Sequence, residues 1–285
     1  MENETKQLRM LFDEKEEIKI VEDEIPTIPE EPISKYGDIY QLGNHRLMCG
    51  DSTNMDDIKK LINGNKIDMI FTDPPYGMNL KTDFSGMKNK LEFAKQKGFI
   101  GGKKYEQGLV DEFQPKMIDI LIKLNVKETF IFGADYFAEL LPNKNDGSWI
   151  VWDKRSNGNN DIEKDYSSDK MYGSCFELCW SRNKHKRDIA RVKWASVFGT
   201  EQEFDHKRHH PTQKPIKLCE WFISKYSKKY DNILDLYGGS GSTLIACELL
   251  NRKCYMMELD PHYIDVIIKR YEKLTREKVV LLNER

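Results

Sequence analysis

Residues 232–243 have the sequence NILDLYGGSGST and run into the apolar segment 244–250. An apolar strand ending in an acid, a glycine turn and a helix N-terminus are typical of an α/β domain that holds a nucleotide-like ligand. Glycine lets the ligand approach the backbone closely, and the helix dipole favours an anionic group. The segment is neither a P-loop, since it lacks Gly-Lys-Ser/Thr, nor a dinucleotide GxGxxG, since the third glycine is missing. We call residues 235–241 the glycine cradle.

A second acid closes the next apolar run. Glu258 ends the segment YMME, seventeen residues beyond Gly241. In open α/β sheets an acid at this place holds the hydroxyls of a ribose. The two segments predict an α/β fold with a mostly parallel sheet and a ligand site at the carboxyl ends of its strands.

Upstream, residues 67–77 (IDMIFTDPPYG) join an apolar run, short enough for a buried strand, to a stiff turn. Two prolines fix the backbone, so residues 73–77, which we call the Asp-Pro-Pro turn, present one carboxylate and one flat ring. This turn suits a planar substrate, because Tyr76 can stack on it while Asp73 and the Pro74 carbonyl accept hydrogen bonds from its exocyclic amine. An ordinary turn is the alternative that these residues alone leave open.

Length and composition set the frame for these segments. The chain has 285 residues, enough for one large α/β domain, and 39% of them are hydrophobic. The formal net charge of −2 gives no global basic signal, so a nucleic-acid surface must be a local patch. Since no apolar run approaches the ~18 residues of a membrane span and no signal-peptide core is present, we expect a cytoplasmic protein without membrane contact. The six cysteines form no CxxC pair, which indicates reduced, packed thiols and no metal site.

Local composition divides the chain. Residues 1–35 are charged and carry three evenly spaced prolines, which predicts an extended arm or linker before a domain at 36–285. Residues 79–108 are rich in Lys and Gly, which predicts a mobile loop. This loop could contact the DNA backbone, or it could be a solvated loop without a binding role. The folded domain is expected to begin at 36–40. We expect helices at 56–63, 111–124, 135–141, 216–225 and 263–284, and strands at 46–49, 129–132, 148–152 and 174–180. The last two strands flank a polar loop and predict a hairpin at one sheet edge.

Two shorter motifs flank these elements. Asp51 follows a predicted strand and precedes a helix, where α/β sheets place ligand contacts. The alternative for this position is a helix N-cap, which Ser52 or Thr53 could supply equally well. The segment HPTQKP at 210–215 is a rigid helix entry whose Lys214 and backbone amides could meet a carboxylate.

The segment at about 181–209 is the most basic part of the chain. Its charge has two interpretations, contact with phosphates and a charged surface that faces solvent. The candidate DNA-binding residues are Arg182, Lys184, Lys186, Arg187, Arg191, Lys193, Lys207 and Arg208.

Together the Asp-Pro-Pro turn, HPTQKP, the glycine cradle and its downstream acid resemble the motifs of the S-adenosylmethionine-dependent DNA amino methyltransferases, which act on N6 of adenine or N4 of cytosine. The family's usual cradle is Asp-Pro-Phe-x-Gly-Ser-Gly-Thr, and here Leu236, Tyr237 and Ser242 replace Pro, Phe and Thr. The Asp-Pro-Pro turn precedes the cradle, which is the circularly permuted order of the family's beta group. The resemblance covers about residues 36–275 and implies a Rossmann-like methyltransferase fold with a small target-recognition insert at about 181–209.

The resemblance also implies a site. Its catalytic residues are Asp73, Pro74, Pro75 and Tyr76. Its residues for S-adenosyl-L-methionine are Asp51, Thr212, Lys214, Pro215, Asp235, Tyr237, Gly239, Gly241 and Glu258. The implied reaction is direct methyl transfer to the exocyclic amine of a base flipped out of double-stranded DNA, and aspartate at the first catalytic position favours N6 of adenine over N4 of cytosine.

The sequence is compatible with two other functions and suggests two partners. An RNA amino methyltransferase and a catalytically silent DNA-binding subunit are the alternatives. The family also suggests a homodimer and a cognate restriction endonuclease as partners.

Overall fold

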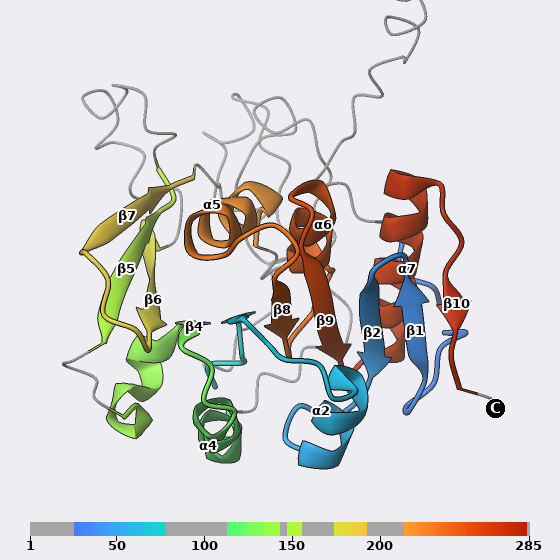
Figure 1. Ribbon diagram of the computed structural model, residues 1–285, viewed down its shortest axis with the longest axis horizontal. Helices are drawn as coiled ribbons and strands as arrows, with labels where there is room; N and C mark the ends of the chain where they lie inside the picture. The colour runs from blue at the N-terminus through green and yellow to red at the C-terminus, as the bar shows by residue number, and fades with distance from the viewer. Residues whose placement is uncertain (1–25, 78–112, 143–146, 156–173, 193–213, 284–285) are drawn as a thin grey trace, which may run out of the picture.

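The computed structural model describes residues 26–77, 113–142, 147–155, 174–192 and 214–283. In these ranges ten strands form one sheet, in the order β10-β1-β2-β9-β8-β3-β4-β6-β5-β7 (Figure 1). The strands are β1 (Ile39–Leu42), β2 (His45–Cys49), β3 (Met69–Thr72), β4 (Glu128–Phe132), β5 (Ser148–Asp153), β6 (Phe176–Ser181), β7 (Asp188–Arg191), β8 (Asn232–Asp235), β9 (Lys253–Glu258) and β10 (Val280–Leu281). The loop predicted at 79–108, the first 25 residues of the predicted arm, and Thr212 lie outside the described residues.

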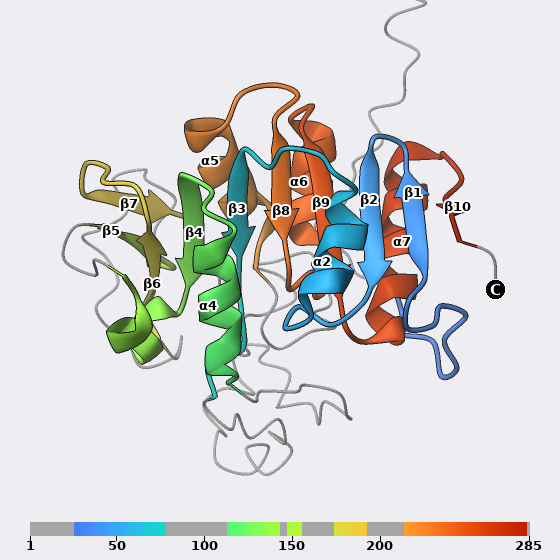
Figure 2. The same cartoon turned by 60° about the horizontal axis from the view of Figure 1, so that its bottom comes forward.

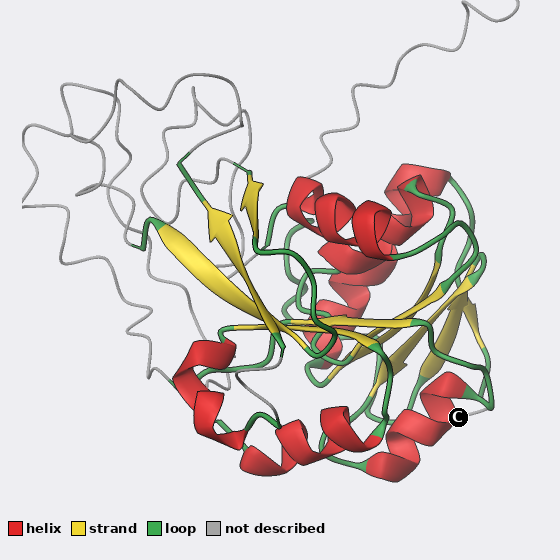
Figure 3. Ribbon diagram, turned by 60° about the vertical axis from the view of Figure 1, so that its left-hand side comes forward, coloured by secondary structure: helices red, strands yellow, loops and turns green. Residues whose placement is uncertain are grey.

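Helices cover both faces of the sheet, as Figures 1 and 3 show. One layer contains α5 (Ile216–Tyr226), α6 (Ser242–Leu249) and α7 (Pro261–Thr275), and the other contains α2 (Met55–Ile62), α4 (Pro115–Lys123) and the 3-10 helix η2 (Ala134–Leu140). Successive side chains of a strand point to opposite faces, so Phe71 joins the core under α5 and its neighbour Ile70 joins the core over α4. Within the described ranges, no helix is both long and apolar enough to span a bilayer.

The five central strands β2, β9, β8, β3 and β4 are parallel, whereas β5 and β6 form an antiparallel hairpin toward one edge. The prediction of a mostly parallel sheet with an antiparallel hairpin near one edge is therefore confirmed. Strand β8 lies directly beside β3 (Figure 2). Because neighbouring parallel strands end at the same edge of a sheet, the glycine cradle and the Asp-Pro-Pro turn leave the sheet side by side.

Two elements differ from the sequence predictions. The final helix, predicted to reach residue 284, ends at Thr275, because Arg276 adopts a φ of 63° and the chain turns back to pair β10 with β1. Strand β7 is not predicted by the sequence and pairs in parallel with β5 inside the basic segment. Only Ala190 of this strand is buried, so its sequence shows little of the apolar alternation that marks a strand.

The described end of the predicted arm lies against α7. Asp265 of that helix accepts hydrogen bonds from the Ile33 amide over 2.6 Å and from the Ser34 hydroxyl over 2.6 Å. Ile28 packs on Tyr263 and Val266 of the same helix. Residues 28–34 thus contact the domain directly.

Candidate active site

The Asp-Pro-Pro turn begins where β3 ends. Thr72, the last residue of β3, is buried, and its hydroxyl donates a hydrogen bond to Asp235 Oδ1 over 2.9 Å. Both carboxylate oxygens of the next residue, Asp73, have partners. The Tyr76 hydroxyl donates to Oδ1, and Lys214 Nζ lies 2.6 Å from Oδ2. The carboxylate therefore stands, held by two contacts, at the sheet edge where α/β folds place their ligands.

The Tyr76 ring has two close neighbours. The exposed ring of Tyr136, from η2, stacks on it with centroids 5.3 Å apart and an interplanar angle of 11°. Gly133 has a φ of 61°, and a Cβ at this position would lie 2.0 Å from the Tyr76 ring. Position 133 requires glycine both for its backbone angle and for the space that the ring fills.

Four charged side chains meet beside the turn, and we call Asp73, Lys154, Glu177 and Lys214 the Lys214 cluster. Lys214 Nζ lies 3.1 Å from Glu177 Oε2, and Lys154 forms an ion pair with Glu177 Oε1. Pro215 is the N-cap residue of α5, so the start of this helix carries Lys214 to the cluster. Two positive charges thereby face two negative charges.

Burial and charge shift the protonation of this cluster in known directions. Loss of water raises the pKa of the Asp73 carboxyl, although the Lys214 ammonium opposes the shift. Burial acts to raise the pKa of Glu177, but the two lysines outweigh it and lower that pKa. Burial opposes charge on Lys214, yet the two carboxylates raise its pKa above the usual value. Lys214 and Glu177 are therefore both charged near neutral pH.

Two acids, Asp235 of the glycine cradle and Glu258 beside it, accept hydrogen bonds from backbone amides. Asp235 Oδ1 accepts a hydrogen bond from the Tyr237 amide over 3.1 Å, and burial raises the Asp235 pKa to about 7. Glu258, at the end of β9, accepts from the amides of Gly239 over 2.7 Å and Asp260 over 3.0 Å. Burial also raises the Glu258 pKa to about 7. Both acids can thus change charge near neutral pH.

Other atoms of the cradle are available to a ligand. Gly239 has a φ of 51° with open space around the place of a Cβ, and Gly241 has a φ of 88°. The buried Ser242 Oγ, at the first residue of α6, has no hydrogen-bond partner among the described residues. A ligand hydroxyl or carboxylate at this helix N-terminus would satisfy that atom.

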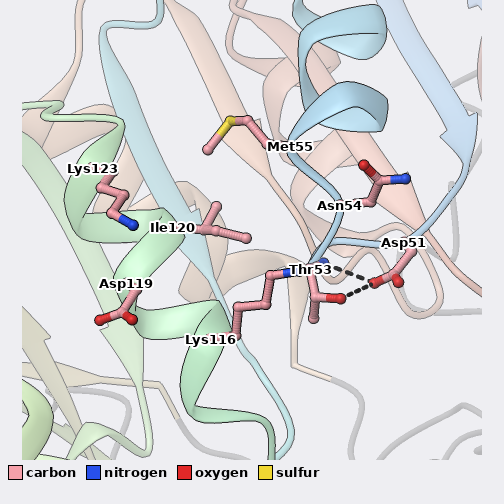
Figure 4. A pocket seen from close by; sticks show the side chains of 8 residues that line it. All are labelled: Asp51, Thr53, Asn54, Met55, Lys116, Asp119, Ile120 and Lys123. Atoms are coloured by element: carbon pink, nitrogen blue, oxygen red, sulfur yellow. Dashed lines mark hydrogen bonds between the residues drawn. The ribbon is translucent and has the colours of Figure 1, made fainter.

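Asp51 lies at the edge of a cavity of about 530 Å³ between the start of α2 and the length of α4 (Figure 4). Its Oδ1 accepts hydrogen bonds from the amide and hydroxyl of Thr53, over 2.7 and 2.8 Å. The N-cap of α2 is Asn54, rather than Ser52 or Thr53.

This arrangement agrees with comparisons to known proteins. Residues 67–270 match the N6/N4 methyltransferase family model, described as DNA methylase. The chain belongs to the N6/N4 DNA methylase family. This membership confirms the resemblance seen in the motifs, the Rossmann-like methyltransferase fold, and S-adenosyl-L-methionine as the methyl donor. It makes DNA the substrate class and leaves adenine and cytosine as the two target bases.

Individual relatives share a low sequence identity with this chain. The methylase is 26% identical over 259 residues to the type II methyltransferase M2.MboI of Moraxella bovis, covering 77% of this chain and 85% of the relative. It is 27% identical over 255 residues to M.HpaI of Haemophilus parainfluenzae, covering 80% and 74%. Among solved structures, the cytosine-N4-specific PvuII DNA methyltransferase covers 85% of this chain and 94% of its own, at 18% identity and a TM-score of 0.48.

Those of the methylase's predicted DNA-binding residues that the structure describes lie at opposite ends of the strands. Strand β6 is antiparallel to β4, with Phe132 opposite Cys179 and Phe130 opposite Ser181, so β6 ends at the edge away from the Asp-Pro-Pro turn. Residues 182–187, which we call the basic turn, follow Ser181 and lie at that far edge. The length of β6 separates the two edges by roughly 17 Å, at about 3.3 Å per residue.

The structure therefore does not bring Arg182, Lys184, Lys186 and Arg187 to the Asp-Pro-Pro turn. Arg182 in addition donates to the carbonyl of Ile122 over 3.0 Å. Arg191 lies at the other edge, because it pairs in register with Asp153 at the carboxyl end of β5. Lys193, Lys207 and Arg208 lie outside the described residues.

Sequence reasoning missed four residues of the methylase's site: Gly133, Tyr136, Lys154 and Glu177. Glu177 is the one signal that was available, because it is an acid within the largely apolar run FELCW. Lys154 directly follows the strand that pairs with this run. No motif marks Gly133 or Tyr136, and Lys214, predicted to bind the donor, contacts Asp73 instead of the cradle.

Proposed function

We propose that the methylase transfers a methyl group from S-adenosyl-L-methionine directly to N6 of adenine in double-stranded DNA. The proposal rests on one observation, the 2.9 Å hydrogen bond from Thr72 to Asp235. Thr72 precedes Asp73, and Asp235 opens the glycine cradle, so a donor in the cradle and an amine at Asp73 would occupy neighbouring positions. Holding both reactants in this way accounts for a large part of enzymatic acceleration.

Asp73 would act on the target amine. The lone pair of an exocyclic amine delocalises into the ring, so the amine is a weak nucleophile. When Asp73 and the Pro74 carbonyl accept its two N–H groups, they draw the nitrogen toward tetrahedral geometry and stabilise the positive charge that develops on it. Pro75 stiffens the turn, and Tyr76 would stack on the flipped base.

The cradle would hold the donor. Bound S-adenosyl-L-methionine supplies an electrophilic methyl group. The Glu258 carboxylate suits its ribose hydroxyls, Asp51 its adenine amine, and the start of α6 with Ser242 Oγ its carboxylate. The unpartnered Ser242 hydroxyl and the open space at Gly239 are the observations that favour this fit.

Aspartate at the first position of the turn supports adenine, and cytosine N4 is the alternative. We would incubate the chain with tritiated donor and unmethylated genomic DNA and digest the product to nucleosides. Label in N6-methyladenine supports the proposal, and label in N4-methylcytosine keeps the mechanism but changes the base. Label in matched RNA oligonucleotides alone would replace DNA by RNA as the substrate.

A matched pair of variants tests the central residue. Asp73→Asn removes the charge at the turn, and Asp68→Asn does the same at the opposite end of β3, on a side chain that is 26% exposed against 24% for Asp73. We expect Asp73→Asn to lose about 100-fold or more in transfer, as for a group that stabilises transition-state charge. Asp68→Asn should retain transfer. If the chain binds the donor and transfers nothing to any nucleic acid, the silent DNA-binding alternative replaces the enzyme.

Two partners remain predictions. Sedimentation of the purified chain at micromolar concentration tests the homodimer. A cognate restriction endonuclease would be tested by challenging DNA, methylated by this chain, with that nuclease.

A further inference from the structure

The Lys214 cluster is built from four segments and shielded from solvent. The side chains of Lys154 and Lys214 are 8% and 12% exposed, and those of Glu177 and Asp73 are 23% and 24% exposed. Aromatic rings surround the Lys214 ammonium, with the centroid of Phe132 at 5.2 Å and those of Tyr76 and Trp152 at 5.9 Å. An ammonium in such surroundings depends strongly on its carboxylate partners.

Each oxygen of Asp73 already accepts a hydrogen bond. The Tyr76 hydroxyl donates to Oδ1, and Lys214 Nζ donates to Oδ2. A carboxylate oxygen can accept a second hydrogen bond, but one that is paired with an ammonium is a weaker acceptor for an amine. The Lys214 nitrogen, 2.6 Å from Oδ2, also occupies a position that an amine nitrogen bound to that oxygen would take.

Glu177 can receive the displaced lysine. Its Oε1 is engaged by Lys154, whereas its Oε2 is buried, lies 3.1 Å from Lys214 Nζ, and accepts no hydrogen bond of good geometry from the described residues. A short movement of the ammonium would give that oxygen its hydrogen bond. The cluster would keep its charge balance while Asp73 changed partners.

We propose that Glu177, held by Lys154, is a positioning residue that takes the Lys214 ammonium from Asp73 when the target amine binds. This inference rests on the proposed function, because it assigns the exchange to the methyl-accepting amine. Before the target base binds, the Lys214 ammonium therefore occupies the place at Asp73 that the target amine later takes. No bond to carbon is made or broken in the exchange, and no proton leaves Lys214.

The groups that face Asp73 determine the direction in which each variant shifts the Asp73 pKa. They come from Tyr76 in its own turn, Lys214 before α5, Glu177 and Cys179 on β6, and Asp235 on β8. Removal of the Glu177 charge should lower the Asp73 pKa, because a negative neighbour is lost. Removal of the Lys214 charge should raise it, because a positive neighbour is lost.

The experiment uses Glu177→Gln and Lys214→Met in the full chain, with Glu128→Gln as the control. Glu128 is 20% exposed and ion-paired with His185 over 2.8 Å, but it lies at the amino end of β4. Carbon-13 NMR of labelled aspartate, with the Asp73 signal assigned by Asp73→Asn, gives the carboxyl pKa without DNA. Single-turnover methyl transfer against pH, with donor affinity from calorimetry, gives the effect on the reaction.

We expect the Asp73 pKa to fall in Glu177→Gln, to rise in Lys214→Met, and to stay unchanged in Glu128→Gln. Glu177→Gln should slow single-turnover transfer by about tenfold or more with unchanged donor affinity, because Lys214 then stays on Asp73. Wild-type rates in Glu177→Gln, or pKa shifts of the same sign in both variants, would overturn the inference. Failure of the wild type to methylate DNA would instead overturn the proposed function, and the carboxyl titration would still report the charge coupling.

Discussion

Thr72 Oγ1 donates a hydrogen bond of 2.9 Å to Asp235 Oδ1, and this bond joins two residues that are 163 positions apart in the chain. Each is the last residue of its strand, and β3 and β8 are neighbours in the parallel part of the sheet. The bond therefore sets the position of the Asp-Pro-Pro turn relative to the glycine cradle. It also places a buried acid at the junction of the two segments.

The first prediction concerns stability against pH. Burial raises the Asp235 pKa to about 7, against about 3.9 for an unfolded aspartate. Between these values the folded chain binds more protons than the unfolded chain, so the free energy of unfolding must fall as pH rises toward 7. Asp235→Asn should remove about 2 kcal/mol of the fall between pH 5 and pH 7.

Urea denaturation at pH 5, 6, 7 and 8 measures this change. Thr72→Val is the companion variant, because it removes a donor that favours the ionised carboxylate and should move the Asp235 transition to higher pH. Parallel curves for the wild type and Asp235→Asn would show that Asp235 does not titrate in this range.

The second prediction concerns donor affinity. In the proposed donor site the ribose hydroxyls donate hydrogen bonds to the ionised form of Glu258, whose pKa burial raises to about 7. The affinity for S-adenosyl-L-methionine should therefore rise as pH increases through 7. Glu258→Gln should lose about tenfold or more at pH 8, as expected when a charged hydrogen-bond acceptor is removed, and should show a weaker pH dependence. Calorimetry between pH 6 and 8 measures both effects.

Glu248→Gln is the control for that experiment. Glu248 lies in α6 and is paired with His45 over 2.7 Å, away from the cradle. Its replacement should leave the pH dependence of donor binding intact. Equal affinities of Glu258→Gln and wild type at pH 8 would remove Glu258 from the donor site.

The third prediction concerns the space beside Tyr76. Gly133→Ala would place a Cβ 2.0 Å from the Tyr76 ring, so the ring must move away from its place beside Asp73. We expect methyl transfer to fall by about 100-fold, as for misplacement of a reacting group, with donor affinity unchanged. Gly64→Ala is a matched control, since Gly64 has a φ of 73° with open space around it. Full transfer by Gly133→Ala would show that the ring position does not matter.

The fourth prediction concerns the DNA-binding face. Lys184, Lys186 and Arg187 are exposed but lie at the sheet edge away from Asp73, whereas Arg191 lies at the near edge. Replacing the three by alanine should leave the salt dependence of DNA affinity nearly unchanged. Arg191→Ala should reduce the slope of log K against log salt by about one. The opposite ranking would place the DNA on the basic turn.

The sequence alone determined the motifs and most of the helices and strands, with β7 and β10 as exceptions. The apolar runs before Asp73, Asp235 and Glu258 are short and end in acids, prolines or glycines, so their local chemistry predicts strands followed by ligand-binding turns. The hairpin of β5 and β6 followed from two apolar runs around a polar loop. These signals are local, because backbone restriction and apolar periodicity are written into a few consecutive residues.

Only the tertiary structure decided which charged side chains meet. The antiparallel pairing of β6 with β4 brings Glu177 to the edge of Asp73 and sends the basic turn to the opposite edge. A one-residue shift of β6 would turn the Glu177 side chain to the other face of the sheet. Lys214 reaches Asp73 because α5 begins beside the hairpin, and Gly133 is required because Tyr76 fills its space. Such pairings depend on the packing of distant segments, which no short stretch of sequence specifies.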